Sequence, residues 1–274
     1  MQNFHMHLVS DATGETLNAI TRAVSVQFGG FDAIEHLHAM VRTPKQMELV
    51  IDVIGRTPGF VMFTLVNTDL RDQLEAGCTR LGVPFIAVMD PVLQALGRYL
   101  GAESAGLPGQ QHQMDTDYFK RIEAMTYTMA HDDGIKTDDL HRADIILVGV
   151  SRSSKTPTSI YLANRGLKIA NVPIVPGIPL PEELDGLKKP MIIGLTVSPD
   201  RLVGIRRTRL QALAETPDTD YVDPEVVAEE VAHARRLLSK KRWPVIDVTR
   251  RSIEETAAAI YNVYQRREEE KAAE

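Results

Sequence analysis

The sequence predicts an α/β protein built on mostly parallel sheets. Short apolar runs alternate with longer segments of helical periodicity along the chain, which is typical of strands joined by helical crossovers. At 274 residues the chain is long for one compact core, so one large or two modest α/β domains fit its length. The longest apolar runs are strand-sized and far below the ~20 residues that span a bilayer, so no membrane span is expected.

Strands are predicted in the first half wherever an apolar run is bounded by turn residues. Helices are expected between them, beginning near Gly14, Pro44 and Asp69. Thr43-Pro44 is a plausible helix entry, because a threonine hydroxyl caps free backbone amides and proline fits the first helical position. The predicted strands are 4–9, 33–40, 59–65 and 84–88.

A boundary is predicted near the middle of the chain. Residues 101–113 are rich in Gly, Pro and Gln and lack apolar periodicity, which marks a loop or linker. The next segment, 115–130, has apolar residues at spacings of three and four and predicts a helix. Strands follow at 144–148, 169–175, 191–195 and 245–248, and the charged tail 266–274 is expected to fray. The expected domains are an N-terminal α/β domain (1–105), a linker and connecting helix (106–140) and a second α/β domain (141–274).

The composition argues against several classes of partner. The formal net charge of −6 comes from 31 basic and 37 acidic residues spread along the chain, which leaves no surface dedicated to nucleic acid or anionic lipid. Cys78 is the only cysteine, which excludes an internal disulfide and a thiolate-rich metal site. The N-terminus lacks the basic start and apolar stretch of a secretory signal. We therefore expect a cytoplasmic protein with no nucleic-acid and no membrane partner.

One loop carries most of the chemical information. A predicted strand, 144–148, precedes it, and Pro157 opens a helix behind it. A P-loop requires that order, because backbone amides and a helix N-terminus must converge on phosphate oxygens. Gly149, Lys155 and Thr156 stand where a P-loop has its glycine, its phosphate-binding lysine and its hydroxyl for Mg²⁺. The loop reads Gly149-Val150-Ser151-Arg152-Ser153-Ser154-Lys155-Thr156.

The loop departs from the usual P-loop pattern at one position. Ser154 stands where that pattern has its second glycine, and the alternative interpretation is a serine-rich loop with an exposed lysine. Arg152 favours the phosphate interpretation, because two cations in a short loop repel each other unless an anion lies between them, although solvent screens exposed charges. The second domain is accordingly predicted to be P-loop kinase-like.

A second candidate phosphate loop, 9–16, follows the first predicted strand. Ligands commonly bind at the carboxyl end of such a strand in open α/β sheets. The alternative is a helix-capping turn in which Ser10, Asp11 or Thr13 accepts the first helical amides. The residues alone leave both interpretations open.

A group of arginines is predicted on one helix of the second domain. Ser198-Pro199-Asp200 begins this helix, and Arg206 and Arg209 share a face of it, while Arg201 and Arg207 point elsewhere. The pair is suited to neutralising phosphate or to docking an acidic protein surface. A solvated basic face is the third interpretation.

Three further side chains are candidate metal ligands. Asp247 follows a predicted strand, as the magnesium-binding acid of P-loop enzymes does, but a strand-end aspartate is also a common turn residue. His5 and His7 alternate on the first strand and so face one side of the sheet. A histidine pair without a third ligand nearby is more often structural, so no metal site is assigned to protein ligands alone.

The two loops, together with His131-Asp132-Asp133-Gly134, resemble the bifunctional kinase and pyrophosphorylase family that regulates pyruvate, phosphate dikinase and phosphoenolpyruvate synthase. The resemblance spans nearly the whole chain, and few unrelated P-loops combine Ser-Arg before the lysine with Thr-Pro-Thr-Ser after it. The Ser-Ser-Lys form and the Ser-Asp-x-Thr-Gly-Glu-Thr opening look like the dikinase branch. Ala12 stands where serine is expected, so no essential hydroxyl is assigned there.

The resemblance implies two opposing reactions on one threonine of pyruvate, phosphate dikinase, next to its catalytic histidine. ADP donates its β-phosphoryl group to the threonine, which leaves AMP and inactivates the target. Inorganic phosphate then attacks the phosphothreonine, releases pyrophosphate and restores activity. Both are phosphoryl transfers, in which positioning and charge neutralisation dominate over covalent catalysis.

Roles for single residues follow from the P-loop pattern and from their places in polar loops. Lys155 and the amides of 149–156 would hold the donor phosphate, and Thr156 would offer its hydroxyl to Mg²⁺. Asp11 or Asp133 would act as the base, although either side chain also suits a helix cap. Phosphoenolpyruvate synthase as target, a small-molecule kinase and a non-enzymatic nucleotide sensor are the alternatives, and a homodimer is left open.

Overall fold

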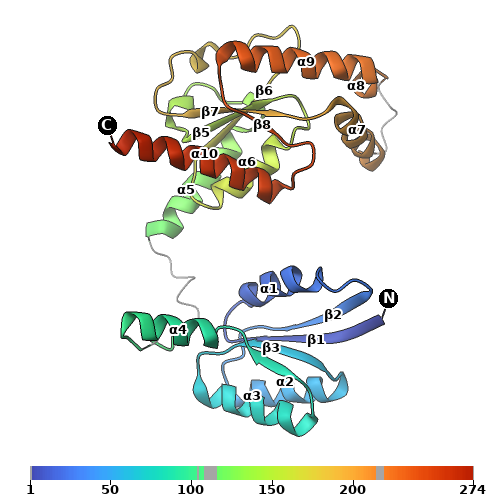
Figure 1. The fold of residues 1–274 in the computed structure, drawn as a ribbon, viewed down its shortest axis with the longest axis vertical. Helices are drawn as coiled ribbons and strands as arrows, with labels where there is room; N and C mark the ends of the chain where they lie inside the picture. The colour runs from blue at the N-terminus through green and yellow to red at the C-terminus, as the bar shows by residue number, and fades with distance from the viewer. Residues whose placement is uncertain (1, 104, 108–115, 214–218, 274) are drawn as a thin grey trace. The chain divides into compact units, whose positions relative to one another are not determined.

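The computed structural model describes residues 2–103, 105–107, 116–213 and 219–273. The chain divides into two compact units, Met1–Gln113 and Met114–Glu274. Each unit holds one four-stranded sheet in which all paired strands run parallel (Figure 1). The predicted α/β class is therefore confirmed.

The first unit has the strand order β2-β1-β3-β4. Helix α1 covers one face of the sheet, and α2 and α3 cover the other (Figure 1). Leu8 and Leu17 are buried on the α1 face, whereas Val9 and Phe63 belong to the core under α2 and α3. The strands are β1 (Gln2–Ser10), β2 (Phe31–His38), β3 (Gly59–Thr64) and β4 (Phe85–Ala87), and the helices are α1 (Glu15–Ser25), α2 (Pro44–Arg56), α3 (Thr68–Leu81) and α4 (Asp90–Leu100).

Local chemistry fixes the start of α2 as the sequence predicted. The hydroxyl of Thr43 accepts a hydrogen bond from the backbone N–H of Gln46, and the Gln46 side chain accepts one from the backbone of Thr43. This reciprocal pair satisfies two amide donors at the helix end. Helix α4 is an element that the sequence analysis did not predict.

The second unit has the strand order β6-β5-β7-β8. Helix α9 covers one face of this sheet, and α6 and α10 cover the other (Figure 1). The strands are β5 (Ile145–Gly149), β6 (Ile169–Pro173), β7 (Met191–Thr196) and β8 (Val245–Asp247). The helices are α5 (Thr116–Ala130), α6 (Lys155–Ala163), α7 (Pro199–Leu213), α8 (Thr219–Val222), α9 (Pro224–Lys241) and α10 (Ile253–Ala273), with short 3-10 turns η2 (Asp132–Gly134), η3 (Leu140–Arg142) and η4 (Glu182–Leu184).

Helix α5 belongs to the second unit, and the charged tail is helical. Helix α5 packs against α6 and β6, so the second unit includes it. The domain limits 1–105 and 141–274 stay a prediction. Part of the expected loop 101–113 lies outside the described residues, and α10 continues through the charged tail to Ala273. Of the helices in the described ranges, none is long and apolar enough to cross a membrane.

The two sheets share one topology. In each, the chain moves from the first strand to an outer second strand and then returns to the third strand on the other side of the first. Ligands bind in open α/β sheets at the carboxyl ends of the strands where the strand order reverses. The loops that follow β1 and β5 occupy this position in their own units, and they are the two candidate phosphate loops.

Candidate phosphate-binding site

The phosphate loop of the second unit begins at Gly149, the last residue of β5. This strand is buried along its whole length. A Cβ atom at Gly149 would lie 2.6 Å from the carbonyl oxygen of Leu195 on β7 and 2.9 Å from the Ser153 hydroxyl oxygen. The neighbouring backbone therefore requires glycine at this position, because a Cβ at that distance would force the strand and the loop apart.

The loop backbone is strained at two residues. Arg152 has φ 69° and Ser154 has φ 63°, both in the left-handed region. That region costs a residue with a Cβ roughly 1–2 kcal/mol, and strain of this kind gathers at functional sites. The conformation of Ser154 gives the physical reason why the usual pattern has glycine there and shows that serine adopts the same backbone.

The loop carbonyls are held by side chains. The carbonyl oxygen of Val150 accepts hydrogen bonds from the Ser153 hydroxyl at 2.8 Å and from Lys155 Nζ at 2.9 Å. The carbonyl oxygen of Ser151 accepts one from Arg206 Nη2 at 3.3 Å. In a trans peptide the C=O and N–H groups point in opposite directions. The N–H groups of Ser151 and Arg152 therefore point away from the side chains that hold these two carbonyls.

The amides of this loop are available to a ligand. Among the residues that the structure describes, the backbone N–H groups of Ser151, Arg152 and Ser154 donate to no acceptor. The first amides of α6 also lack intrahelical partners, as in every α-helix. Free amides at a helix N-terminus form an anion-binding site. The backbone thus has the form that a phosphate group requires.

Lys155 is buried, with 4% of its surface exposed, so the alternative of an exposed lysine is wrong. Burial lowers the pKa of the Lys155 amine to about 8. The charges of Asp133, Asp132 and Glu230 oppose that shift. The ammonium group thus donates to the Val150 carbonyl oxygen beside the loop and lies in the electrostatic field of three carboxylates.

Thr156 belongs to a polar cluster that the sequence analysis did not identify. Its hydroxyl donates to the Asp132 carboxylate at 3.0 Å. The side-chain amide of Asn171, on β6, donates to the same carboxylate oxygen and to the Thr156 hydroxyl at 3.1 Å. The Asn171 side-chain oxygen is buried and, within the described residues, has no hydrogen-bond partner. A carboxylate and a hydroxyl therefore stand side by side at the edge of the phosphate loop.

His131 anchors the turn that carries Asp132. Its Nδ1 bonds the carbonyl oxygen of Tyr127 at 2.7 Å, and its Nε2 contacts the Asp139 carboxylate. The His131 carbonyl oxygen accepts a hydrogen bond from the Asn171 backbone N–H at 2.9 Å. The hydrogen bond from His131 is the largest of the interactions that lower the pKa of Asp139 to about 2. The imidazole thus ties the turn to Tyr127 and Asp139, and the His131 carbonyl oxygen ties it to β6.

The two predicted base candidates lie in different units. Asp133 is in the second unit, exposed, and contributes to the electrostatic field at Lys155. Asp11 is in the first unit and buried, where its carboxylate accepts a hydrogen bond from the backbone N–H of Val66 at 2.8 Å. Burial raises the pKa of Asp11. In the first unit, Asp11 therefore ties the end of β1 to the segment after β3.

Of the three interpretations of Arg206 and Arg209, the solvated basic face is wrong for Arg206. Arg206 is buried, with 2% of its surface exposed, whereas Arg209 is exposed. Both terminal nitrogens of Arg206 bond the Glu230 carboxylate on α9 at 2.8 Å. A carboxylate on a neighbouring helix has therefore drawn this guanidinium inward, away from solvent and from any direct contact with a partner protein.

The other metal candidates have structural roles. The carboxylate of Asp247 accepts hydrogen bonds from the backbone and hydroxyl of Thr249, and β7 separates its strand from β5. The turn interpretation of Asp247 fits this geometry. His5 and His7 contact His36 and His38 on β2, with nitrogen–nitrogen distances of 2.9 and 3.2 Å. In the part of the chain that the structure describes, no group of three or more His, Cys, Asp or Glu side chains could hold a metal ion.

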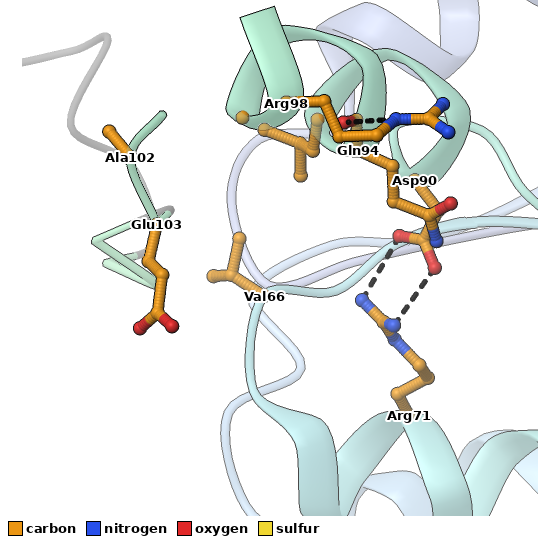
Figure 2. A pocket seen from close by; sticks show the side chains of 9 residues that line it. Val66, Arg71, Asp90, Gln94, Arg98, Ala102 and Glu103 are labelled. Atoms are coloured by element: carbon orange, nitrogen blue, oxygen red, sulfur yellow. Dashed lines mark hydrogen bonds and ion pairs between the residues drawn. The ribbon is translucent and has the colours of Figure 1, made fainter. Parts of the chain in front are cut away.

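The first unit has a cavity of about 480 Å³ near the end of β3. Figure 2 shows the side chains of Arg71 and Asp90 facing each other at this cavity. They form a bidentate salt bridge, with nitrogen–oxygen distances of 2.8 and 3.0 Å. Val66, whose N–H binds Asp11, also lines this cavity. Because Asp90 neutralises the charge of Arg71, we do not propose that this cavity binds phosphate.

A glycine-ended strand, a loop with free amides and a buried lysine at a helix start are the features of a candidate phosphate-binding site in an α/β protein. A family model described as Kinase/pyrophosphorylase matches residues 6–261. The chain is 54% identical to a protein of Maricaulis maris, covering 95% of this chain and 93% of that protein. It is 55% identical to one of Caulobacter vibrioides, covering 95% and 82%. It is 51% identical to one of Bradyrhizobium sp. strain ORS 278, covering 99% and 98%.

The names of all three relatives contain the words "pyruvate, phosphate dikinase regulatory protein". The matched family and the extent of the identity settle the class of this protein. The chain belongs to the kinase/pyrophosphorylase family and is a phosphotransferase enzyme.

Proposed function

We propose that this enzyme is a bifunctional regulator of pyruvate, phosphate dikinase. In one direction it transfers the β-phosphoryl group of ADP to a threonine of the dikinase and inactivates it. In the other it uses inorganic phosphate to remove that group as pyrophosphate. The observation that carries the proposal is the buried Lys155 beside a loop of free amides, in a chain whose relatives are named for the dikinase. We propose the cytoplasm as its compartment, and a homodimer stays a prediction.

The phosphate loop holds the donor. The amides of 149–156 bind the oxygens of the β-phosphoryl group, and Lys155 adds the nearest positive charge. In the free protein the Lys155 ammonium donates to the Val150 carbonyl oxygen at 2.9 Å. Binding of ADP replaces that acceptor by a phosphate oxygen, so the lysine is already positioned and needs little rearrangement.

The Thr156 cluster fits a magnesium ion. Mg²⁺ prefers hard oxygen ligands and is usually bound by one or two carboxylates together with substrate phosphates and water. The Asp132 carboxylate and the Thr156 hydroxyl supply two such oxygens, 3.0 Å apart, next to the loop. These two residues would hold the ion, and Asn171 would hold them. When bound, the ion neutralises charge on the phosphates.

Asp133 is the better placed of the two base candidates, because it lies in the same unit as the loop and its charge reaches Lys155. In the forward direction its carboxylate takes the proton of the threonine hydroxyl as that oxygen bonds to phosphorus. The bond between phosphorus and the oxygen bridging the α- and β-phosphates breaks, and AMP leaves with the electron pair. Asp11 stays the second candidate, and its bond to Val66 would have to open for that role.

The reverse reaction uses the same groups in opposite roles. An oxygen of inorganic phosphate forms a bond to the phosphorus of phosphothreonine, and the bond from phosphorus to the threonine oxygen breaks. The threonine oxygen then takes a proton from Asp133, which enters this reaction protonated after exchange with solvent, whereas it enters the transfer from ADP as a carboxylate. Pyrophosphate leaves, so each direction keeps its count of phosphoryl groups and protons.

The experiment compares two lysine variants with the parent enzyme. The pure protein and dikinase are incubated with ADP, and phosphothreonine on the dikinase is measured. Lys155→Ala should lose more than about a hundredfold of the transfer, since charge stabilisation is a large part of phosphoryl-transfer catalysis. Lys240→Ala removes an exposed lysine on α9 and should transfer normally. Near-normal transfer by Lys155→Ala would contradict the phosphate-loop assignment, and ADP binding without any transfer by the parent would favour a nucleotide sensor.

A further inference from the structure

The guanidinium of Arg206 connects its own helix, α7, with α8, α9 and the phosphate loop. It bonds both oxygens of Glu230 on α9 at 2.8 Å, and Nη1 also donates to the carbonyl oxygen of Tyr221 on α8 at 3.2 Å. It lies over the Tyr221 ring, with 4.5 Å between the guanidinium carbon and the ring centroid. From α7 it then reaches the phosphate loop, where Nη2 donates to the carbonyl oxygen of Ser151 at 3.3 Å.

We propose that Arg206, with Glu230 as its counter-ion, is a positioning residue that holds the phosphate loop in its ligand-binding form. The inference rests on the proposed function, because it concerns the same loop. It assigns the buried pair a task that differs from both roles expected for this arginine, which were neutralising phosphate and docking the partner protein.

The geometry of the peptide unit supplies the mechanism. A carbonyl oxygen turned toward a phosphate would repel it, whereas an N–H group attracts it. Because Arg206 holds the Ser151 carbonyl, the N–H of Arg152 in the same peptide unit is kept on the opposite side. This constraint matters most where the backbone is strained, and Arg152 itself has φ 69°. Without the bond, rotation of this peptide would turn the carbonyl toward the ligand.

The charge arrangement excludes a simple electrostatic role. Both ends of the guanidinium are neutralised by Glu230, so the pair adds little net positive charge to the loop. Arginine is suited to the task because its planar fork binds a carboxylate with two bonds and still has donors for carbonyls, which the single ammonium of lysine does not provide. The pair also lines a cavity of about 740 Å³ beside Ser151, so a substituted side chain has room to rearrange.

Three variants separate positioning from electrostatics. Arg206→Met with Glu230→Met removes the whole pair, an exchange that buried ion pairs often tolerate without loss of stability. Glu230→Gln keeps the shape but removes the counter-charge. Arg206→Lys keeps the charge but not the fork. The matched control is Arg207→Met, which removes an exposed charge from the next position of the same helix.

Calorimetric Kd values for ADP, thermal midpoints and the KM values for ADP and dikinase are measured for each variant. The paired Met variant should stay folded, bind ADP about tenfold more weakly and show a raised KM for ADP with an unchanged KM for dikinase. Arg206→Lys should lie between it and the parent. Measured at pH 6.5, where Lys155 stays charged, Glu230→Gln should also bind ADP more weakly, whereas a purely electrostatic role predicts tighter binding because a negative charge near the phosphate is lost.

The outcomes discriminate among the accounts. A folded paired Met variant that binds ADP within twofold of the parent overturns the inference, as does tighter binding by Glu230→Gln. A raised KM for dikinase with normal ADP binding shows a docking role instead. If the paired variant does not fold, the direction in which Glu230→Gln and Arg206→Lys change the affinity for ADP still tests the inference. Lys155→Ala serves as the marker for the proposed function: if it binds ADP normally, that function fails, whatever the arginine variants show.

Discussion

The Thr156 hydroxyl donates a hydrogen bond to the Asp132 carboxylate at 3.0 Å, joining two residues 24 positions apart. The first turn of α6 and the turn before β5 therefore meet at the phosphate loop. The contact identifies Asp132, rather than its neighbour Asp133, as the acidic residue next to the hydroxyl that P-loop enzymes use for Mg²⁺.

Asp132→Asn should raise the Mg²⁺ concentration that half-saturates transfer about tenfold or more, because an amide is a weaker ligand for Mg²⁺ than a carboxylate. Binding of ADP in the absence of Mg²⁺ should change little. The test is a Mg²⁺ titration of phosphothreonine formation, with Asp138→Asn as the matched control, since Asp138 is exposed in the same segment. An unchanged Mg²⁺ requirement in Asp132→Asn would remove this residue from the site.

The affinity for ADP should fall as the pH rises through about 8, the pKa to which burial lowers the Lys155 amine. The direction follows from the charge, because the amine is a cation below that pH and loses its attraction for phosphate above it. Calorimetry from pH 7 to 9.5 checks the prediction. Lys155→Arg keeps its charge over this range, so any remaining affinity of that variant should be nearly independent of pH. A flat profile for the parent enzyme would rule out Lys155 as the phosphate-binding cation.

Ser154→Gly should preserve both ADP binding and thermal stability. Glycine removes the strain of a residue at φ 63° but loses more conformational freedom on folding, so two effects of roughly 1 kcal/mol oppose each other. Ser154→Val places a β-branched side chain in the same conformation and should lower the thermal midpoint and weaken ADP binding. Equal behaviour of the two variants would show that the left-handed conformation of this residue does not matter.

The first unit should lose stability when the pH falls below about 6.5, the ordinary pKa of histidine. Burial lowers the pKa of His7, and burial next to His7 and His36 lowers that of His38 to about 4. Between about pH 6.5 and about pH 4, these histidines are protonated in the unfolded chain but neutral in the folded unit. Acidification through this range therefore favours unfolding. Hydrogen exchange of β1 amides, corrected for intrinsic rates, should accelerate at pH 4.5 relative to pH 7. His38→Asn should reduce that difference, and equal protection at both pH values would contradict the account.

Local patterns predicted the strand, the loop and the helix start that carry the candidate site. The order of strand, glycine, lysine and hydroxyl defines the loop, since each part depends on neighbours in sequence. The sequence also shows a charged residue at Asp132, but it does not show which group that side chain contacts. The contact with Thr156 depends on β6 and on the buried His131, which bring distant segments together.

Burial of Arg206 depended on an element that was not predicted. Its partner Glu230 lies on α9, where Asp223 caps the helix and apolar residues recur at spacings of three and four, so the signals were present. Helix α4 was also missed, and none of its residues is buried. Propensity and periodicity locate helices, but the pairing of charges between them is a property of the packed structure.

The fate of the β-phosphoryl group of ADP decides whether this enzyme is the proposed dikinase regulator. ADP labelled only in that group is incubated with the enzyme and dikinase, in nucleotide stocks freed of ATP. We expect the label to move to threonine with an equal amount of AMP, and added inorganic phosphate then to release it as labelled pyrophosphate. Transfer only from the γ-phosphoryl group of ATP, with no label moving from ADP, would contradict the account and point to an ordinary kinase.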